Sequence, residues 1–327
     1  MPTFEDRIRF GVHMGQQDLS LSSYVDRWKA AESVGYDWAS VFDHFRSMDR
    51  NPEGPCFEST TLLAGLAVQT TRIRCAILAT GNTYRNPAVL AKAAVTIDHL
   101  SGGRMELVIG AGWFETEHHA YGIEMPPTGQ RIRMLGESAK ILKSLWTQHR
   151  TTFHGRYYTI TDALCEPKPL QKPHIPLWVA GMGEKLTLRV AAESADGWTG
   201  VFVSQEEYVH KLDVLAAHCR DVGRDPAEIR KSVLLEAIVG ETEKEAQERG
   251  RRLAAVRKND LTWLKAHGIV GTPEQCVEQL LPYVKLGVDD FLITARVPAE
   301  MEALELVAKK IAPVVKEEGQ KILAARR

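Results

Sequence analysis

Residues 73–109 read IRCAILATGNTYRNPAVLAKAAVTIDHLSGGRMELVI, and the fold prediction starts from this stretch. Two short, mainly apolar runs at 73–79 and 104–109 predict buried strands. Between them, residues 87–100 begin with a proline, which is favoured at the first position of a helix, and continue as an amphipathic helix. A helical crossover joins strands that run parallel. The stretch therefore predicts one strand–helix–strand unit of a parallel sheet.

The same alternation continues in both directions along the chain. It predicts eight strands, over residues 8–14, 38–42, 73–79, 104–109, 177–180, 197–202, 232–239 and 290–294. A helix follows nearly every strand, which is the pattern of an α/β protein with a parallel sheet. Eight such units in 327 residues favour a closed (β/α)8 TIM barrel over an open doubly wound sheet. We expect a single barrel domain over residues 1–327.

Two segments depart from the alternation and are predicted to be insertions, near residues 145–175 and 240–268. The first contains a hairpin signal at Gly155, followed by a proline-rich stretch in which a helix cannot form. In the second, residues 241–258 carry ten charges, a density that is typical of a solvated helix.

Capping boxes predict two helix starts. Ser23 with Asp26 predicts a helix that ends at Gly35, and Thr272 with Gln275 predicts another with Pro273 at its first position.

The composition favours a small-molecule partner. The 41 basic and 42 acidic residues give a net charge of −1, without the basic excess of a nucleic-acid binder or the basic stripe of a membrane-surface protein. The five cysteines form no C-x-x-C motif, which excludes a zinc ribbon, and they fit reduced thiols. The N-terminus shows no signal peptide, and no apolar run reaches the ~20 residues of a membrane span. We therefore expect a cytoplasmic protein.

In a TIM barrel, the loops after the strands carry the chemistry. Asp43 and His44 follow the second strand and form a candidate catalytic pair, because histidine titrates near neutrality and a carboxylate can fix its tautomer. The structural alternative is that Asp43 binds loop amides and His44 packs. After the third strand, Thr80, Gly81 and Asn82 form either a close approach to a ligand or a plain turn.

The loop after the fourth strand opens space for a ligand. Its candidate binding residues are Gly110, Ala111, Gly112 and Trp113. Glu115 stands where a dinucleotide-binding G-x-G-x-x-G motif has its third glycine. The nearby Glu117-His118-His119 lacks the spacing of a zinc motif, so we expect no metal.

The loop after the fifth strand has the features of a phosphate site. Its candidate residues are Ala180, Gly181, Met182, Gly183, Glu184 and Lys185. A glycine-rich turn followed by a helix, expected to begin at about Glu184, presents free N–H groups to an anion. The alternative is a structural tight turn. A Walker A motif and a G-x-S-x-G motif are both absent from the sequence, so a nucleophilic hydrolase has no support.

Taken together, these segments resemble the luciferase-like monooxygenase superfamily. More narrowly, the chain resembles the oxidoreductases of that superfamily that use the deazaflavin coenzyme F420. The matching segments, in order over about residues 8–315, are FDHF (42–45), TGNTYRNP (80–87), SGGR (101–104), GAGW (110–113), EHHAYG (117–122), GRYY (155–158), IPLWVAG (175–181), ADGW (195–198) and GTPE (271–274). Each segment alone is weak evidence for the resemblance, but the whole set in this order is specific to the family.

The resemblance implies a homodimeric TIM barrel with a cofactor across the carboxyl end of the strands. The cofactor ring would lie near Ile77, Leu78, Thr80 and Gly112, over a bulge with a non-prolyl cis peptide at the place of Ile77 and Leu78. The phosphate would bind residues 181–185. His44 would lie near the redox face, and Asp43 would orient it or bind a cofactor hydroxyl. Sugar-phosphate dehydrogenases of this group carry a glutamate where this chain has Trp113 and a tryptophan where it has Met48, so that substrate is in doubt.

The resemblance thus predicts hydride transfer between coenzyme F420 and a small organic substrate, with His44 giving or taking a proton. Three alternatives stay open. The first is an FMN-dependent monooxygenase that uses oxygen and reduced flavin, the latter supplied by a separate flavin reductase. For the deazaflavin, a separate F420 reductase would supply the reduced cofactor. The second is a metal-dependent hydrolase that uses Asp43, His44, His118 and His119. The third is a binding barrel without enzymatic activity.

Overall fold

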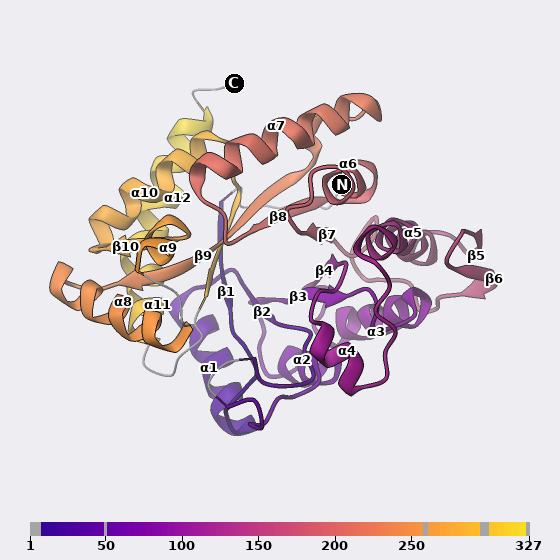
Figure 1. Ribbon diagram of the computed structural model, residues 1–327, viewed down its shortest axis with the longest axis horizontal. Helices are drawn as coiled ribbons and strands as arrows, with labels where there is room; N and C mark the ends of the chain where they lie inside the picture. Colours follow the sequence, from indigo (N-terminus) through magenta and orange to yellow (C-terminus); the bar gives the residue numbers. More distant parts are fainter. Residues whose placement is uncertain (1–7, 49–50, 258–260, 295–300, 325–327) are drawn as a thin grey trace.

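The computed structural model describes residues 8–48, 51–257, 261–294 and 301–324. Eight parallel strands close into a barrel (Figure 1). In order around the barrel they are β1 (Arg9–His13), β2 (Trp38–Val41), β3 (Arg74–Gly81), β4 (Met105–Gly110), β7 (Leu177–Ala180), β8 (Gly197–Val201), β9 (Arg230–Val239) and β11 (Asp290–Thr294). The pairings of β9 with β8 and of β11 with β1 complete the circle. The TIM-barrel prediction is confirmed.

The helices cover the outside of the barrel (Figure 1). The larger ones are α1 (Leu21–Val34), α2 (Ser59–Ala67), α3 (Pro87–Leu100), α5 (Thr128–Thr147), α6 (Thr187–Ser194), α7 (Gln205–Asp221), α10 (Pro273–Lys285) and α12 (Ala312–Ala324). Shorter ones are α4 (Glu115–Ala120), η1 (Pro226–Glu228), α11 (Met301–Leu306) and the π-helix η3 (Val307–Ile311). Among the described helices, none is both long and apolar enough to cross a membrane.

One of the two predicted helix caps is confirmed. Thr272 and Gln275 form the expected capping box at the start of α10, and Pro273 occupies the first turn. The cap at Ser23 is wrong: α1 begins at Leu21, and the Ser20 hydroxyl accepts from the Ser23 N–H at 3.2 Å. Three serines lie within four residues here, so the sequence offers competing caps.

The first irregular segment is a hairpin at the edge of the molecule (Figure 1). Its strands β5 (Arg150–His154) and β6 (Thr159–Leu164) pair antiparallel, and the turn closes where the Gly155 N–H donates to the Tyr158 carbonyl at 2.9 Å. The second segment holds α8 (Glu243–Arg257), α9 (Leu261–Ala266) and a short strand that was not predicted, β10 (Gly268–Gly271). β10 pairs with the last four residues of β9, outside the barrel.

Side chains fill the half of the barrel at the amino ends of the strands. Trp38 and Trp178 stack inside it with ring centroids 6.4 Å apart. Gly11 and Gly197 make room for them, because a Cβ at either position would lie within 2.4 Å of an indole ring. Beneath the tryptophans, Arg9 binds Glu106 at 2.6 Å. Open space is therefore confined to the carboxyl ends of the strands.

Candidate active site

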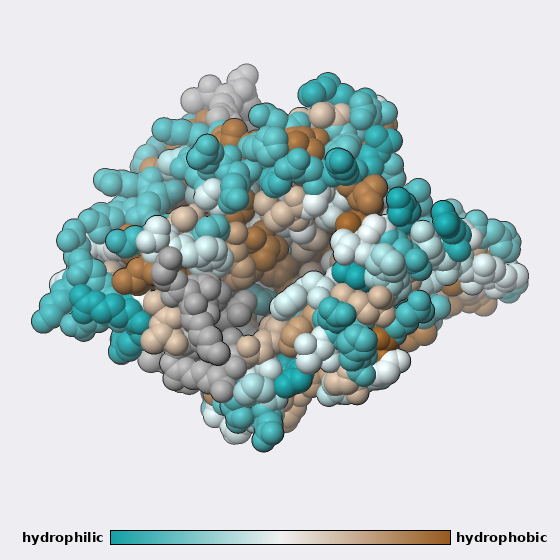
Figure 2. Space-filling model, in the orientation of Figure 1, coloured by the Kyte–Doolittle hydropathy of each residue, from teal (hydrophilic) through white to brown (hydrophobic). Residues whose placement is uncertain are grey.

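A cavity of about 720 Å³ opens at the carboxyl ends of the strands. Figure 2 shows this face hollowed in its middle, with apolar residues at the base of the hollow. The apolar part of the lining is formed by Phe42, Met48, Leu78, Ala79, Ala111, Trp113, Ile132, Ala180, Met182, Val201, Phe202 and Leu234. Such a mainly apolar, concave site with few polar groups is typical of cofactor and substrate binding.

Glycines form much of the wall on the side of β3, β4 and β7, namely Gly81, Gly110, Gly112, Gly181 and Gly183. A Cβ on Gly110 would lie 3.3 Å from the Cβ of Ala79, and Gly112 has a φ of +79°. The missing side chains leave a surface that a flat ring can approach closely.

A bulge in β3 supports this wall. The pairing with β4 shifts between Ile77 and Thr80, and the peptide bond between Leu78 and Ala79 is cis. The cis bond thus lies one residue beyond the expected place. Leu78 and Ala79 line the cavity, whereas Ile77 packs into the layer between the barrel and the helices.

Two other predicted residues of this wall, Thr80 and Asn82, are buried outside the cavity lining. After the bulge, Thr80 alternates with Ala79 and Gly81, which line the cavity, and so faces the other side, whereas Asn82 lies beyond the end of the strand.

His44 lies in the cavity lining and is held by a carboxylate from another loop. Its Nδ1 lies 2.9 Å from Oε2 of Glu117, a residue of α4 that is fully buried. The same Oε2 accepts the Tyr84 hydroxyl at 2.6 Å, and Oε1 accepts the N–H groups of Phe45 and Arg46. Glu117 thus ties α4 to the loop after β2 and fixes the imidazole ring.

The charge state of Glu117 determines the tautomer of His44. Burial raises the pKa of Glu117, but the hydrogen bonds from His44, Tyr84 and Phe45 outweigh it, so the pKa is lowered from its ordinary value. An ionised carboxylate only accepts, so the Nδ1 of His44 is the donor. In the neutral ring, Nε2 therefore has the lone pair and can accept a proton.

Two roles are expected for Asp43, orienting His44 or binding a cofactor hydroxyl, and its partners in the structure do not include His44. Its carboxylate accepts from the Ser59 hydroxyl at 2.6 Å, the Gly81 N–H at 2.8 Å and Nη1 of Arg85 at 2.7 Å. These bonds join the loops after β2 and β3, so Asp43 holds the Gly81 loop in place. It still lies in the cavity lining.

The histidines on α4 do not form a metal site. His118 is buried, with Nδ1 at 2.8 Å from the Phe114 carbonyl and Nε2 at 2.7 Å from the Thr83 hydroxyl. His119 is exposed beside Glu115. Within the described ranges, no group of three or more His, Cys, Asp or Glu side chains is placed to hold a metal ion. The hydrolase alternative therefore lacks its ligands there.

The loop after β7 has the features of an anion site. Gly181, Met182 and Gly183 line the cavity, and the N–H groups of Met182 and Gly183 have no hydrogen-bond partner among the described residues. The following helix, α6, begins at Thr187 rather than near Glu184. It has neither a side-chain cap nor an acidic residue in its first turn. Its N-terminus can therefore stabilise a negative charge.

Arg131 on α5, which was not predicted, lines the same cavity and is the only arginine or lysine among the described residues of that lining. The residue is 7% exposed. Its guanidinium donates to the Pro126 carbonyl at 2.5 Å and to the Thr128 hydroxyl at 3.3 Å, while Nε has no partner. Within the described chain it has no carboxylate counter-ion. A buried, unneutralised guanidinium is suited to bind an anion.

Two predicted phosphate ligands point elsewhere. The Glu184 carboxylate binds Lys211 and His210 on α7. Lys185 is exposed and outside the cavity lining. Both assignments assumed that α6 begins at about Glu184, whereas residues 184–186 form a turn.

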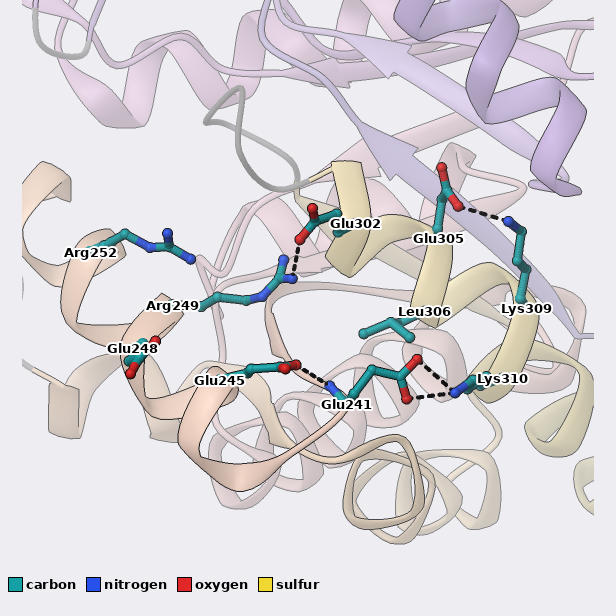
Figure 3. Close-up of a pocket in the computed structure, with 10 residues that line it drawn as sticks. All are labelled: Glu241, Glu245, Glu248, Arg249, Arg252, Glu302, Glu305, Leu306, Lys309 and Lys310. Carbon is teal, nitrogen blue, oxygen red and sulfur yellow. Dashed lines mark hydrogen bonds and ion pairs between the residues drawn. The ribbon is translucent and has the colours of Figure 1, made fainter.

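A second hollow, of about 600 Å³, lies between α8 and α11 (Figure 3). Apart from Leu306, its lining is charged, and most of the charges are paired. Arg249 binds Glu302 at 2.6 Å, Lys309 binds Glu305 at 2.7 Å, and Lys310 binds Glu241 at 2.6 Å. This groove offers no apolar wall for a ring, so the barrel mouth is the candidate active site.

A parallel barrel with a cofactor-sized cavity and a fixed imidazole at its carboxyl end is the architecture of a TIM-barrel enzyme. The chain belongs to the luciferase-like monooxygenase family, whose sequence model matches residues 6–261.

Among its relatives is an FMNH2-dependent dimethylsulfone monooxygenase from Pseudomonas putida, 27% identical over 82% of this chain and 81% of that protein. An F420-dependent glucose-6-phosphate dehydrogenase from Nocardia farcinica is 26% identical over 94% of this chain and 97% of that protein. Among solved structures, an F420-dependent secondary alcohol dehydrogenase in complex with an F420–acetone adduct superposes with a TM-score of 0.82. It is 20% identical and covers 94% of this chain and 99% of its own.

Proposed function

We propose that the protein is an oxidoreductase that uses coenzyme F420 to transfer a hydride to or from a small organic substrate. The observation that carries the proposal is the glycine wall of the cavity together with the His44 imidazole of the lining, which is fixed by a buried carboxylate. The F420-dependent relative that aligns over nearly the whole chain supports the choice of cofactor.

The residues present fit a ring with a phosphate-bearing tail. Leu78, Ala79, Gly110 and Gly112 would bind the ring, because a side chain at either glycine would occupy its space. The free N–H groups of Met182 and Gly183, the N-terminus of α6 and the Arg131 guanidinium would hold the phosphate. Arg131 lines the cavity without a carboxylate partner in the described chain, so its guanidinium is the charged group of the lining suited to such a ligand.

When bound, coenzyme F420 supplies two-electron hydride chemistry. His44 would handle the proton that accompanies the hydride, through its Nε2. Glu117 keeps the ring in the correct tautomer and stabilises the imidazolium once Nε2 is protonated. Trp113 and Phe114 each pack edge-on against the imidazole at 5.7 Å and shield it from water on that side.

The second candidate is an FMN-dependent monooxygenase, and the similarity to the dimethylsulfone monooxygenase over four fifths of the chain favours it. The same anion site would hold the FMN phosphate, and a separate flavin reductase would supply the reduced flavin. Coenzyme F420 has a longer anionic tail than FMN, and Arg85 is not available to bind it, since its guanidinium is paired with Asp43 and Glu58.

The deciding experiment titrates the purified apoprotein with coenzyme F420 and, separately, with FMN, and follows cofactor fluorescence. We expect tight binding of F420 and weaker binding of FMN. Tight binding of FMN alone would replace the first proposal with the second. If neither binds, both proposals fail, because both require the same ring and phosphate sites.

We further propose that the protein is a cytoplasmic homodimer. Val68 and Val89, next to α2 and on α3, are more than half exposed, and an apolar groove of about 400 Å³ lies between α1 and α2. A second copy would cover this surface. The five free cysteines fit a reducing compartment. Light scattering of the wild type and of Val89→Asp would test the dimer, and cell fractionation would test the location.

A further inference from the structure

Phe202 is a bulky residue of the cavity lining whose side chain faces the cavity against the pattern of its strand. It directly follows β8, and neighbouring residues of a strand face opposite sides. Val201 lines the cavity, so regular alternation would turn Phe202 outwards. Phe202 instead has a φ of +46°, a left-handed conformation that is uncommon for a bulky residue. Both side chains therefore line the cavity and pack on the apolar cluster inside the barrel.

The place of Phe202 in the barrel is across the mouth from His44. In the order of the strands, β8 lies four places from β2 in either direction, and His44 belongs to the loop after β2. The apolar cluster under Phe202 includes Leu78 and Leu234, which also line the cavity. An apolar chain on a substrate whose reacting carbon lies beside His44 would therefore extend over these leucines towards the Phe202 ring.

The Phe202 ring is backed by a tryptophan of the segment inserted after β9. Trp263 on α9 lies with its ring centroid 5.9 Å from that of Phe202. It stacks on His267, with centroids 4.3 Å apart and planes at 17°, and packs against the apolar cluster around Ile238 and Leu264. Trp263 is not among the described residues that line the cavity. Its effect on the cavity therefore passes through Phe202.

We propose that Phe202 is a specificity-determining residue that limits the length of the apolar part of the substrate, and that Trp263 is a positioning residue that keeps the Phe202 ring in the cavity. A packed ring yields little space, because protein interiors are close-packed. Each methylene of a substrate gains affinity while it enters apolar space, and gains none where the ring blocks it. The inference rests on the proposed function for the reacting end of the substrate, but its binding step does not require turnover.

The test measures binding of the unbranched ketones 2-butanone, 2-hexanone, 2-octanone and 2-decanone to the protein saturated with oxidised coenzyme F420. Ketone and cofactor are both oxidised, so no hydride moves, and calorimetry reports the affinity. We expect the affinity of the wild type to rise about threefold to fourfold for each methylene and to stop rising at a limiting length. A chain that merely emerges into solvent would also stop gaining affinity, so variants must identify the surface that sets the limit.

Three substitutions test the wall, and one is a control. Phe202→Ala should move the limit to longer ketones and raise the affinity for the first ketone beyond the wild-type limit about tenfold, as two more buried methylenes provide. Phe202→Leu, which keeps much of the apolar volume, should move the limit less. Trp263→Ala should move it in the same direction as Phe202→Ala, because the ring loses its support. Leu261→Ala should keep the wild-type limit, since Leu261 is exposed on the same helix as Trp263.

The inference is overturned if the wild type binds none of the ketones or shows no limiting length, if Phe202→Ala keeps the wild-type limit, or if Leu261→Ala moves it as far as Trp263→Ala does. Thermal melting checks that each variant is folded, and Phe202→Leu takes the place of Phe202→Ala if the latter is not. Failure of the proposed function gives a different result, namely that coenzyme F420 does not bind. The same series is then titrated against the FMN complex, or against the protein alone if FMN does not bind either, and the shift in Phe202→Ala has the same meaning.

Discussion

The two ends of the barrel each hold a buried arginine, and the two arginines differ in whether they are paired. At the amino end, Arg9 is paired with both Glu106 and Asp290, and Arg74 and Arg230 complete the network. At the carboxyl end, Arg131 is buried to a similar extent but has no carboxylate partner in the described chain. The difference teaches that buried charge satisfied by the chain supports the fold, whereas buried charge left partly unsatisfied is available to a ligand.

The largest expected effect is a loss of stability when the ion-pair network at the amino end of the barrel is broken. Glu106→Ala leaves Arg9 and Arg74 without a shared counter-ion, which should lower the free energy of unfolding by about 3–5 kcal/mol. Urea denaturation measures the change. The matched control is Glu305→Ala, which breaks an exposed pair with Lys309 and should cost less than about 1 kcal/mol. Equal effects of the two substitutions would contradict this distinction between buried and exposed pairs.

At the open end, His44→Ala should lower turnover about a hundredfold to a thousandfold, because the general acid–base group is lost. Cofactor affinity should change little. Steady-state kinetics and fluorescence titration measure the two quantities. His119→Ala is the control, since His119 is exposed on the same short helix as Glu117. Full activity of His44→Ala would remove this residue from the mechanism.

Acid should reduce the stability that the ion-pair network at the amino end of the barrel provides. Burial raises the pKa of Glu106, but the charges of Arg9 and Arg74 outweigh it and lower the pKa to about 2. A carboxyl whose pKa is lowered on folding stabilises the protein fully above its ordinary value of 4.5, and the contribution is lost as the pH falls towards 2. Urea unfolding at pH 5, 4 and 3 should show a steeper loss for the wild type than for Glu106→Gln. Parallel slopes would contradict the prediction.

Arg131→Met should separate ligand binding from folding. We expect cofactor affinity to fall about tenfold to a hundredfold, the range for a charge-assisted hydrogen bond. Stability without cofactor should change by less than about 1 kcal/mol, because no carboxylate is left unpaired. The control is Arg133→Met, an exposed residue two positions along α5. A large loss of stability with unchanged affinity would assign Arg131 to the fold instead.

Glu117→Gln should have the smallest effect, a decrease in turnover of about tenfold. An amide can still occupy the place of the carboxylate, but it no longer forces Nδ1 of His44 to be the donor. Nitrogen chemical shifts of the His44 ring should show a mixture of tautomers in the variant and a single tautomer in the wild type. A single tautomer in both proteins would show that Glu117 does not select it.

Periodicity was sufficient to predict all eight barrel strands but not the short strand β10 outside the barrel. The eight barrel strands are runs of branched apolar residues with helices between them, which local patterns identify. β10 was missed because it has only four residues, begins and ends with glycine, and is stabilised by its pairing with β9. The family resemblance implied a ring near both Ile77 and Leu78, whereas neighbouring strand residues face opposite sides and Ile77 packs towards the helices.

In the site, the sequence identified residues but not all of their partners. His44 and the glycine loops were predicted, because they lie where a barrel places its chemistry. Asp43 was chosen as the partner of His44 because it is adjacent, whereas the carboxylate that reaches the ring is Glu117, 73 residues away. Arg131 gave no signal, since a single arginine on a helix is ordinary until its burial and its missing counter-ion are known.

The segment with α8, α9 and β10 leaves and rejoins the barrel at one point. The Gly240 N–H donates to the Gly271 carbonyl at 3.1 Å, directly after β9 and β10 pair. The strand contacts that close the barrel, from β9 to β8 and to β11, use residues of β9 before this point. For protein engineering, residues 241–270 can therefore be exchanged as one segment, because the residues on either side of it, Gly240 and Gly271, are hydrogen-bonded to each other. Replacing this segment would leave the strand pairings that close the barrel intact.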